Sequence, residues 1–531
     1  MRSFFERLDP RIYIALSGLL LGVSVTFAQV GFLAYFAMIP MALSVLKKVR
    51  DGAYKKKKSA YADGFIFFIC YYLVAYHWLL YFYPLDFAGM SKLASAVVVG
   101  FAWIGLSLLQ TVVGALNVLW LYLFSKTAVY KKAPLLIAPF AAALWAIFEW
   151  TQTLTWAGVP WGRIALSQAH YTVALQTASW FGSYFVTFVI VIVNFLLAYA
   201  LFDRKRIKLC SIAALCVAGA NIACGTVLFF VPSNNAEEKI TMAALQGNQN
   251  SHETVDFAEI FDVYTEYSKK AAEEGAEVIV WPETALPCNV GEGDSVCEYL
   301  SMLSEKVNAT LVVGLFTYRE DGKEVNSMAA FYPDGSYDLN AYAKQRPVPF
   351  GEFVPMRSLI ETLIPPLANI NILSSDLTPG DRAEIFNSSS EGDGVDIGTL
   401  ICFDSIYDEL GYNTVRAGAE VVIIPTNDSW FYDSRGVYMH LYQAKLRAIE
   451  MGRYIVRAGN TGVSAVISDK GVIEESIDVF KEGYIVRDVN ASNYRTLYSC
   501  IGNTFVYLLI VLSVSPFAAQ LVLALRKKKS K

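Results

Sequence analysis

Long apolar runs are the feature that most constrains how this chain folds. A helix needs about 20 mostly apolar residues to cross the hydrocarbon core of a bilayer. The pattern predicts eight such spans: Ile12–Ala28, Phe32–Leu46, Ala62–Tyr83, Ala94–Phe124, Leu135–Trp150, Val173–Phe202, Ile207–Val231 and Thr504–Leu525. The fourth is too long for one straight helix and too short for two, so a single tilted or extended helix is the simplest interpretation.

Basic residues predict the orientation of these spans, because cytoplasmic loops carry an excess of Lys and Arg. With eight spans, every basic cluster falls on one side: Arg2/Arg7/Arg11, Lys47–Lys58, Lys126–Lys132, Arg204–Lys208 and Arg526–Lys531. Both termini are therefore expected in the cytoplasm. Residues 1–231 are predicted to form a seven-span domain, residues 232–502 a soluble domain outside the cytoplasm, and residues 503–531 the last span with a basic tail.

Polar side chains inside the predicted spans are expensive to bury in lipid. They either hold helices together by hydrogen bonds or serve function. The candidates are Gln110, Asn117, Glu149, Asn194 and Asn221. Glu149 stands out because it carries a carboxylate near the predicted outer end of its span.

The soluble part has the pattern of an α/β domain. Helical stretches such as Val255–Glu273 and His440–Met451 separate short β-branched runs that predict strands. Turns at Pro333–Gly335 and Asp469–Gly471 predict two hairpins. The predicted strands are Ile240–Leu245, Val278–Trp281, Thr310–Leu315, Met328–Tyr332, Ile397–Cys402, Val421–Pro425 and Ser464–Ser468. The mixture indicates a mixed sheet in a layered α/β domain.

Composition excludes several partners and cofactors. The soluble part has no basic stripe with interleaved aromatic residues, so nucleic acid is not expected to bind. It has no GxGxxG motif and no P-loop for a nucleotide. With four histidines and no CxxC pair in the chain, a metal site is not expected either. We therefore predict chemistry without a cofactor.

Three chemically useful side chains follow predicted strands. Glu283 comes after Val278–Trp281, Lys344 ends the segment Asn340–Lys344, and Cys402 ends its own strand. Catalytic groups are often found at strand ends, where a rigid scaffold holds them. A thiol, a carboxylate and an amine can act as nucleophile, base and electrostatic stabiliser.

The local sequences around these residues resemble the three signature motifs of the nitrilase superfamily. They are Trp281-Pro282-Glu283-Thr284, the run Lys344–Glu352, and Cys402-Phe403-Asp404, in the family's order. This resemblance implies an αββα sandwich with a Glu-Lys-Cys triad. The sequence thus predicts a polytopic α-helical membrane protein into which a nitrilase-type domain is inserted.

A nitrilase-like domain between seven helices and one helix resembles the apolipoprotein N-acyltransferases. Further matching segments are Gly158–Trp161, Leu245–Asn248, Pro349–Pro355 and Thr426–Phe431. The resemblance implies transfer of an acyl chain from a phospholipid to the N-terminal cysteine amine of a diacylglyceryl lipoprotein. It also implies a multi-pass protein of the bacterial inner membrane, with its catalytic domain on the periplasmic side.

The same resemblance assigns roles to individual residues. Cys402 would be the nucleophile that forms a thioester, Glu283 the base and Lys344 the stabiliser, and Glu352 matches a further glutamate that the family needs. The family usually has an aromatic residue and then Glu after the nucleophile, and this chain has Phe403-Asp404. Phe403 lacks the hydroxyl of a tyrosine and Asp404 has a shorter reach, so the roles of these two residues in substrate binding stay open.

Two other classes of function remain as alternatives. A membrane-anchored nitrilase-type amidase or lipid hydrolase needs the same triad, whereas a transporter or receptor with a binding domain needs none of it. Two details bear on the mechanism. The apolar segment Val354–Thr378 could shield a thioester from water or contact the membrane, and Cys288 and Cys297 could form a disulfide outside the cytoplasm.

Overall fold

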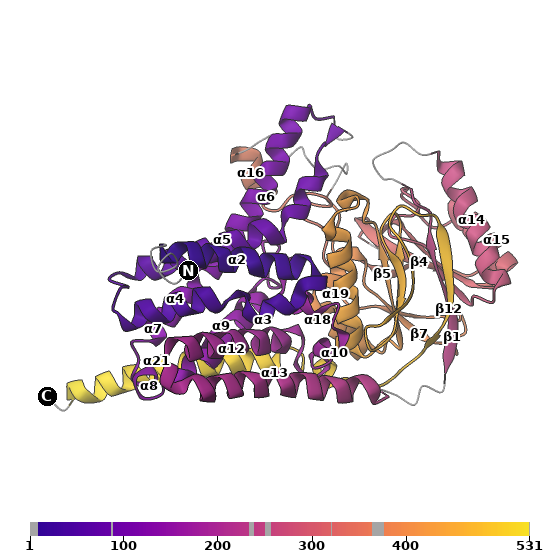
Figure 1. The fold of residues 1–531 in the computed structure, drawn as a ribbon. Coiled ribbons are helices and arrows are strands. Elements are labelled where there is room, and N and C mark those ends of the chain that lie inside the picture. The colour runs from indigo at the N-terminus through magenta and orange to yellow at the C-terminus, as the bar shows by residue number, and fades with distance from the viewer. Residues whose placement is uncertain are drawn as a thin grey trace. The chain divides into compact units, whose positions relative to one another are not determined.

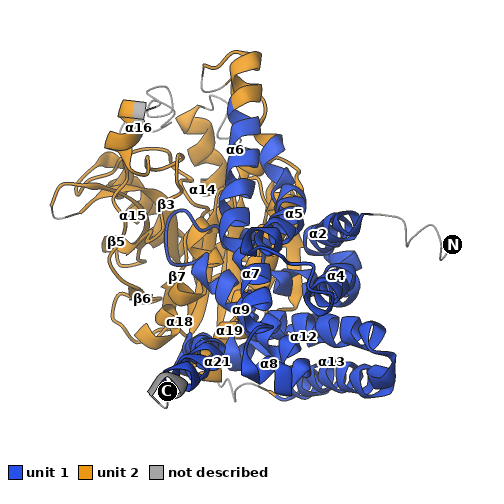
Figure 2. Ribbon diagram, turned by 90° about the vertical axis from the view of Figure 1, so that its left-hand side faces the viewer, with its two compact units in different colours: residues 1–80, 98–231, 501–531 blue, residues 81–97, 232–500 orange. Residues whose placement is uncertain are grey.

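Two compact units make up the chain in a computed structural model that describes residues 9–86, 89–232, 238–249, 256–319, 321–363 and 376–529 (Figure 1). Unit 1 contains residues 1–80, 98–231 and 501–531, and unit 2 contains residues 81–97 and 232–500 (Figure 2). The segment 81–97 thus groups with the soluble part, although it includes the end of the predicted span Ala62–Tyr83 and the start of Ala94–Phe124.

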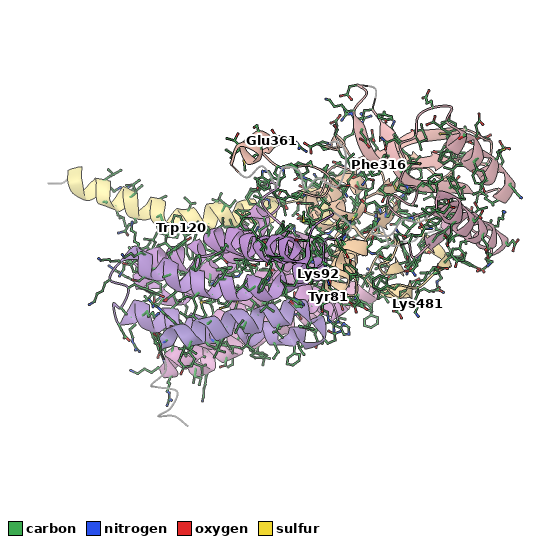
Figure 3. All side chains as sticks on the ribbon, turned by 90° about the horizontal axis from the view of Figure 1, so that it is seen from above. Tyr81, Lys92, Trp120, Phe316, Glu361 and Lys481 are labelled. Atoms are coloured by element: carbon green, nitrogen blue, oxygen red, sulfur yellow. The ribbon has the colours of Figure 1, made fainter. Side chains whose placement is uncertain are left out.

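Unit 1 is helical. Its helices are α2 (Pro10–Thr26), α3 (Ala34–Ala37), α4 (Ile39–Arg50), α5 (Lys57–Ala75), α6 (Lys92–Gly114, which begins in unit 2), α7 (Leu116–Phe124), α8 (Ala128–Lys132), α9 (Ile137–Thr151), α10 (Thr172–Leu175), α11 (Ala178–Phe181), α12 (Ser183–Phe202), α13 (Ile207–Phe230) and α21 (Thr504–Lys529). The closest packing involves α2 with α5, and α12 with α9 and α13. Trp120 of α7 packs its ring against Phe517 of α21, with centroids 5.4 Å apart (Figure 3).

Small residues allow α2 to approach α5 closely. Gly18 and Gly22 have the GxxxG spacing that brings membrane helices together. A Cβ at Gly18 would lie 2.2 Å from the carbonyl oxygen of Phe67, and one at Gly22 would lie 2.6 Å from Cβ of Val74. Larger side chains would therefore force these two helices apart.

Six helical segments of the described part are long and apolar enough to cross a membrane. They are Ala28–Arg50, Lys92–Phe124, Pro134–Thr151, Ser183–Phe202, Arg204–Phe230 and Thr504–Arg526. α2, with 17 residues, falls among the shorter apolar helices. The predicted Ala94–Phe124 span is one long helical run, and the structure thus confirms a set of apolar helices but not the count of eight.

The predicted span Val173–Phe202 is interrupted in the structure. Gly182 has a φ of +74° and separates α11 from α12. The apolar pattern alone did not indicate this break, because only the left-handed backbone at a glycine produces it.

The polar side chains of the predicted spans are hydrogen bonded. Glu149 accepts from the Ile164 backbone N–H at 2.8 Å and from the Thr187 hydroxyl at 2.7 Å. Gln110, Asn194 and Asn221 each donate to a backbone carbonyl of another segment, and Asn117 donates to the carbonyl of Gly114. Apart from that of Asn117, which stays within its own helical run, these contacts fit a role in holding segments of the helical unit together.

Unit 2 contains two six-stranded sheets, in the orders β12-β1-β2-β3-β4-β5 and β11-β10-β9-β8-β7-β6. The strands are β1 (Lys239–Gln246), β2 (Val278–Val280), β3 (Thr310–Tyr318), β4 (Glu324–Phe331), β5 (Tyr337–Ala343), β6 (Ile385–Asn387), β7 (Asp396–Thr399), β8 (Val421–Thr426), β9 (Ile455–Gly459), β10 (Ser464–Ile467), β11 (Ile473–Ile477) and β12 (Gly483–Asn490). The strands β1, β2 and β3 are parallel to one another, as are β7, β8 and β9.

Helices cover the outer faces of the two sheets, which gives four layers (Figure 1). The helices of unit 2 are α14 (Phe257–Glu273), α15 (Ser295–Val307), α16 (Arg357–Leu363), α18 (Asp408–Ala417), α19 (Arg435–Met451) and α20 (Leu497–Ile501). Alternate residues of the first sheet point in opposite directions: Met242 and Val280 face the core between the sheets, whereas Ala243 and Ile279 face α14 and α15. This is the predicted αββα sandwich.

The two predicted hairpins are present. The turn at Pro333–Gly335 joins β4 to β5, and the turn at Asp469–Gly471 joins β10 to β11. The seven predicted strands correspond to β1, β2, β3, β4, β7, β8 and β10. The two hairpins also implied β5 and β11 as their second strands, whereas the sequence did not reveal β6, β9 and β12, because their runs are short or lack a clear period.

Candidate active site

Two glutamates surround one buried lysine. The Nζ atom of Lys344, directly after β5, lies 2.7 Å from Oε1 of Glu283 and 2.8 Å from Oε2 of Glu352. Burial by itself lowers the pKa of Lys344, but the carboxylates of Glu283 and Glu352 raise it well above its ordinary value. The ammonium group is therefore held charged at a site that water barely reaches.

Cys402 lies beside this cluster, at the start of the turn that follows β7. Burial and the negative charge of Glu283 raise the pKa of its thiol well above the ordinary value, against the opposing effect of Lys344. The thiol of Cys402 is thus neutral at rest, and it would need a base in order to react as a nucleophile. The structure brings Glu283, Lys344 and Cys402 together as the sequence predicts.

The backbone is strained at the turns that carry these side chains. Cys402 has a φ of +48°, Thr284 next to Glu283 also has +48°, and Phe350 between Lys344 and Glu352 has +64°. Non-glycine residues rarely adopt this region, and a β-branched threonine there is an outlier. Strain of this kind gathers at functional sites, where the surrounding structure holds it in place.

Asn326 and Asn427 also belong to the site: the sequence did not reveal Asn326, whereas Asn427 lies in the matching segment Thr426–Phe431. The amide group of Asn326, on β4, donates to Oε1 of Glu283 at 2.9 Å and to Oε1 of Glu352 at 2.7 Å. The backbone N–H of Asn427, after β8, donates to Oε2 of Glu283 at 2.9 Å. These donors fix the orientation of both carboxylates, and only the strand pairing brings them to the site.

Asp404 is buried and forms hydrogen bonds with the backbone that follows Lys344. Its carboxylate accepts hydrogen bonds from the N–H of Arg346 at 2.7 Å, the N–H of Gln345 at 3.3 Å and the hydroxyl of Tyr342 at 2.8 Å. Burial raises its pKa to about 6, although Lys344 and these donors oppose the shift. Asp404 therefore links the segment that carries Cys402 to the segment that carries Lys344.

Phe403 follows Cys402 directly in the chain. Its ring meets that of Tyr407 edge to face, with centroids 5.5 Å apart. Its side chain is buried, so the missing hydroxyl leaves an apolar contact at this position.

A second buried network lies behind Cys402. His440 of α19 places Nδ1 2.8 Å from Asp428 and Nε2 3.1 Å from the carbonyl oxygen of Cys402, and Arg457 of β9 lies 2.6 Å from Asp428. Burial opposes the ionisation of Asp428, but His440 and Arg457 lower its pKa to about 2. The network braces the backbone of Cys402, and of its members only Asp428 lies in a segment that the sequence singled out, Thr426–Phe431.

Cys402, Asp428 and His440 bring three potential metal donors within 4.8 Å of one another. The fit to a metal ion is poor, because the Asp428 carboxylate is already in contact with His440 and with the Arg457 guanidinium. A second cation at that carboxylate would repel Arg457 in a buried setting. The donor set fits a hydrogen-bonded network better.

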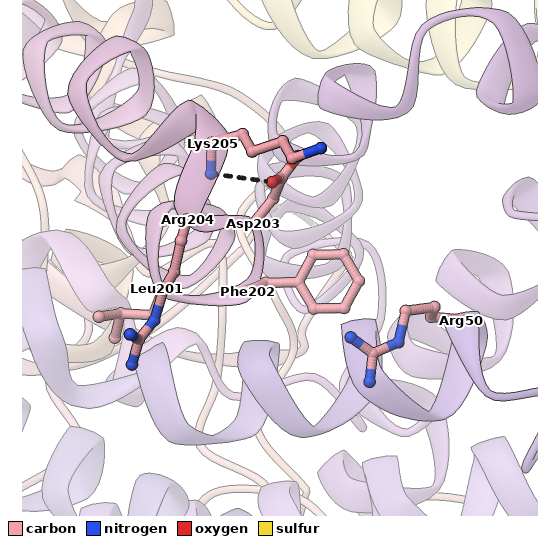
Figure 4. A pocket seen from close by; sticks show the side chains of 6 residues that line it. All are labelled: Arg50, Leu201, Phe202, Asp203, Arg204 and Lys205. Atoms are coloured by element: carbon pink, nitrogen blue, oxygen red, sulfur yellow. Dashed lines mark hydrogen bonds between the residues drawn. The ribbon is translucent and has the colours of Figure 1, made fainter.

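Two further predictions concerned a shielding segment and a disulfide, and a separate cavity lies in unit 1. Of the predicted shield Val354–Thr378, residues 364–375 lie outside the described residues. Cys288 and Cys297 are both free thiols in the structure, so the hypothesis of a disulfide between them has no support there. A cavity of about 560 Å³ in unit 1 is lined by Arg50 and residues 201–205, and it contains none of the predicted catalytic residues (Figure 4).

Comparisons with known proteins cover both units. The family model "Carbon-nitrogen hydrolase" matches residues 241–498, and the model "Apolipoprotein N-acyltransferase N-terminal domain" matches residues 17–196. The apolipoprotein N-acyltransferase of Geobacter metallireducens is 28% identical over 99% of this chain and 97% of its own length. That of Gloeobacter violaceus is 28% identical over 94% of this chain and 91% of its own length. Among solved structures, yeast Nit3 of the nitrilase superfamily aligns with 52% of this chain and 98% of its own, at 18% identity and a TM-score of 0.39.

The soluble unit is thus a carbon–nitrogen hydrolase domain, carried by a chain with membrane-type helices. Because the second family model covers most of those helices and the relatives align over nearly the full length, the chain belongs to the apolipoprotein N-acyltransferase family.

Proposed function

We propose that this protein transfers an acyl chain from a phospholipid to the N-terminal cysteine amine of a diacylglyceryl lipoprotein, through a thioester on Cys402. Family membership supports lipoprotein N-acylation as the reaction. The observation that carries the mechanism is the buried cluster of Glu283, Lys344 and Glu352 beside a thiol on a strained turn.

The first half-reaction forms the thioester. Glu283 takes the proton of the Cys402 thiol as the sulfur attacks the ester carbonyl of the phospholipid. Lys344 stabilises the oxyanion of the tetrahedral intermediate, since its ammonium is held charged by two carboxylates. The ester C–O bond then breaks, and Glu283 returns the proton to the glycerol oxygen of the departing lysophospholipid.

The second half-reaction uses the same groups in the opposite direction. The amine of the lipoprotein attacks the thioester, a C–N bond forms and the C–S bond breaks. Glu283 accepts the amine proton and returns it to the Cys402 sulfur. Glu352 and Asn326 hold Lys344 and Glu283 in place through the contacts described above.

The membrane arrangement completes the proposal. We infer eight spans with both termini in the cytoplasm, a seven-span domain over residues 1–231, a catalytic domain over 232–502 and a last span with a basic tail over 503–531. The positive-inside pattern supports a periplasmic position for the catalytic domain in the bacterial inner membrane. The phospholipid donor then comes from the bilayer that holds the protein.

Intact-protein mass spectrometry with phospholipid alone tests this mechanism. The wild-type protein should gain one acyl mass that hydroxylamine removes, and a diacylglyceryl peptide with a free N-terminal cysteine should discharge it as an amide. Cys402→Ala should form no adduct. Glu283→Gln and Lys344→Ala should form it more slowly, by ~10²–10³-fold for the loss of the oxyanion partner.

Matched variants control for general damage to the protein. Cys500→Ala, Glu298→Gln and Lys306→Ala change exposed residues of the same types and should behave as wild type. Peptide acylation without a thioester, or full transfer by Cys402→Ala, would contradict the mechanism. Release of fatty acid without peptide acylation would favour a membrane-anchored amidase or lipid hydrolase, and binding without turnover would favour a receptor.

A further inference from the structure

Arg346 is a basic residue held close to the segment that carries Cys402. It follows Lys344 by two residues, and its backbone N–H donates to Asp404 at 2.7 Å. Asp404 in turn lies two residues after Cys402. The position of the Arg346 backbone is therefore tied directly to the turn that carries the thiol.

The side chain of Arg346 is positioned by an aromatic ring. Its guanidinium carbon lies 5.3 Å from the ring centroid of Tyr407, and that ring packs against Phe403, the neighbour of Cys402. A guanidinium over a ring face keeps its N–H donors at its edge, where they can still bind an anion. The ring thus orients the cation without neutralising it.

Arg346 has no carboxylate partner in the described part of the chain. The ion pairs found there leave it out, and its side chain is partly exposed. This contrasts with Lys344, two residues earlier, which lies between two carboxylates. An oriented, partly exposed and unpaired guanidinium that contacts Tyr407, close in sequence to Cys402, is arranged to meet an anion that arrives with the substrate.

We propose that Arg346 binds the phosphodiester of the phospholipid donor and so favours a phosphate-bearing ester over a neutral one. The inference rests on the proposed function, which brings the ester carbonyl of a phospholipid to Cys402. The phosphate is only a few bonds from that carbonyl, on the leaving-group side. Arginine is well suited to bind this phosphate, because the geometry of its N–H donors allows two parallel hydrogen bonds to phosphate oxygens.

The chemistry of the two substrates favours the donor over the acceptor as the partner of Arg346. The acceptor presents an amine at its reacting end, and a cation beside the nucleophile offers it no attraction. The donor presents a permanent negative charge near its reacting end. Arg346 should therefore act in thioester formation and not in thioester discharge.

A matched pair of donors tests this inference. Phosphatidylethanolamine and diacylglycerol with the same acyl chains are presented in non-ionic detergent micelles, and thioester formation on Cys402 is followed by mass spectrometry. Arg346→Gln should lower kcat/KM for phosphatidylethanolamine roughly 10- to 100-fold, because a charged hydrogen bond is lost. It should change the slower reaction with diacylglycerol by less than about 3-fold, since that donor has no phosphate to bind.

Three further measurements make the result decisive. Arg346→Lys should recover part of the preference for phosphatidylethanolamine, because it keeps the charge but loses the two parallel hydrogen bonds. Arg495→Gln, at an exposed arginine of the same unit, should behave as wild type. A thioester formed beforehand on Arg346→Gln should pass to the acceptor peptide at the wild-type rate.

Equal losses on both donors would overturn the inference, since they would mean that Arg346 only supports Tyr407 and the surrounding fold. Slower discharge to peptide with normal thioester formation would overturn it in favour of the acceptor. If the wild-type protein forms no thioester with either donor, the proposed function itself fails, and that result is recognisable before any Arg346 variant is compared.

Discussion

Asp404 shows how a single side chain couples the charge state of the site to its geometry. In its ionised form it accepts three hydrogen bonds, two of them from the backbone that follows Lys344. Its protonated form would direct an O–H toward donors that already face it. The segment that carries Lys344 should therefore be well held only when Asp404 is charged.

We predict opposite trends of activity and stability between about pH 4 and pH 7. Burial raises the pKa of Asp404 from 3.8 to about 6, so activity should fall as the pH drops through about 6. The folded pKa lies above the unfolded one, so the stabilising effect of protonation is complete below about pH 4 and is lost as the pH rises through about 6. The difference corresponds to ~3 kcal/mol.

The measurement compares pH profiles of thioester formation and of thermal unfolding in wild type and Asp404→Asn. The variant should lose the part of both profiles centred near pH 6, whereas Asp433→Asn, at an exposed aspartate, should keep them. An unchanged activity profile in Asp404→Asn would show that another group controls the reaction in this range.

The sequence revealed the site residues whose types are chemically reactive and lie in recognisable motifs. Glu283, Lys344 and Cys402 sit in recognisable motifs at strand ends, and the structure brings them together. Asn326 and His440 lie in no such motif, and an asparagine in a strand or a histidine in a helix is ordinary. They reach the site through pairing of β4 with β3 and packing of α19, which no local pattern specifies.

At the scale of elements, β3 supports the site through a residue that has no side chain. Gly314 lies where β3 passes the turn after β2, and a Cβ there would be 2.2 Å from the carbonyl oxygen of Pro282 and 2.8 Å from Cα of Glu283. Contacts of this length are impossible without movement. The parallel pairing of β2 with β3 therefore sets the position of the predicted base.

We predict that Gly314→Ala lowers the rate of thioester formation by ~10²-fold, because a shift of about 1 Å at a catalytic group has an effect of that size. The cost to stability should be ~1–3 kcal/mol, as for other overpacked sites. Gly291→Ala is the control, since a Cβ there makes only an ordinary contact at 3.7 Å. Wild-type rates in Gly314→Ala would mean that Glu283 is not held by β3.

At the scale of the whole molecule, the sequence predicted the type of each unit better than the residues at which each unit begins and ends. Apolar runs identified the helical unit, since lipid imposes length and hydropathy directly. They missed the break at Gly182, and they did not reveal that residues 81–97 group with the soluble unit. The latter depends on contacts such as those of Phe82 with Trp430 and Phe431, with ring centroids 6.4 and 5.9 Å apart.

The orientation of the chain is the prediction that covers the whole molecule. If the basic clusters lie in the cytoplasm, then Ser336, in the exposed turn between β4 and β5, lies outside it, and Lys55, in a basic loop, lies inside. In a background without the exposed Cys216 and Cys500, Ser336→Cys should react with a membrane-impermeant thiol reagent in spheroplasts. Lys55→Cys should react only after the membrane is opened, because the charged reagent cannot cross the bilayer. Labelling is read by the mass added to the purified protein, and the unlabelled background gives the baseline. The reverse pattern would place the catalytic unit in the cytoplasm. It would also place both termini outside the cytoplasm with the number of spans unchanged, so the predicted orientation would fall. Labelling of both residues from the same side would make the number of spans between them even, and the eight-span topology would then fall.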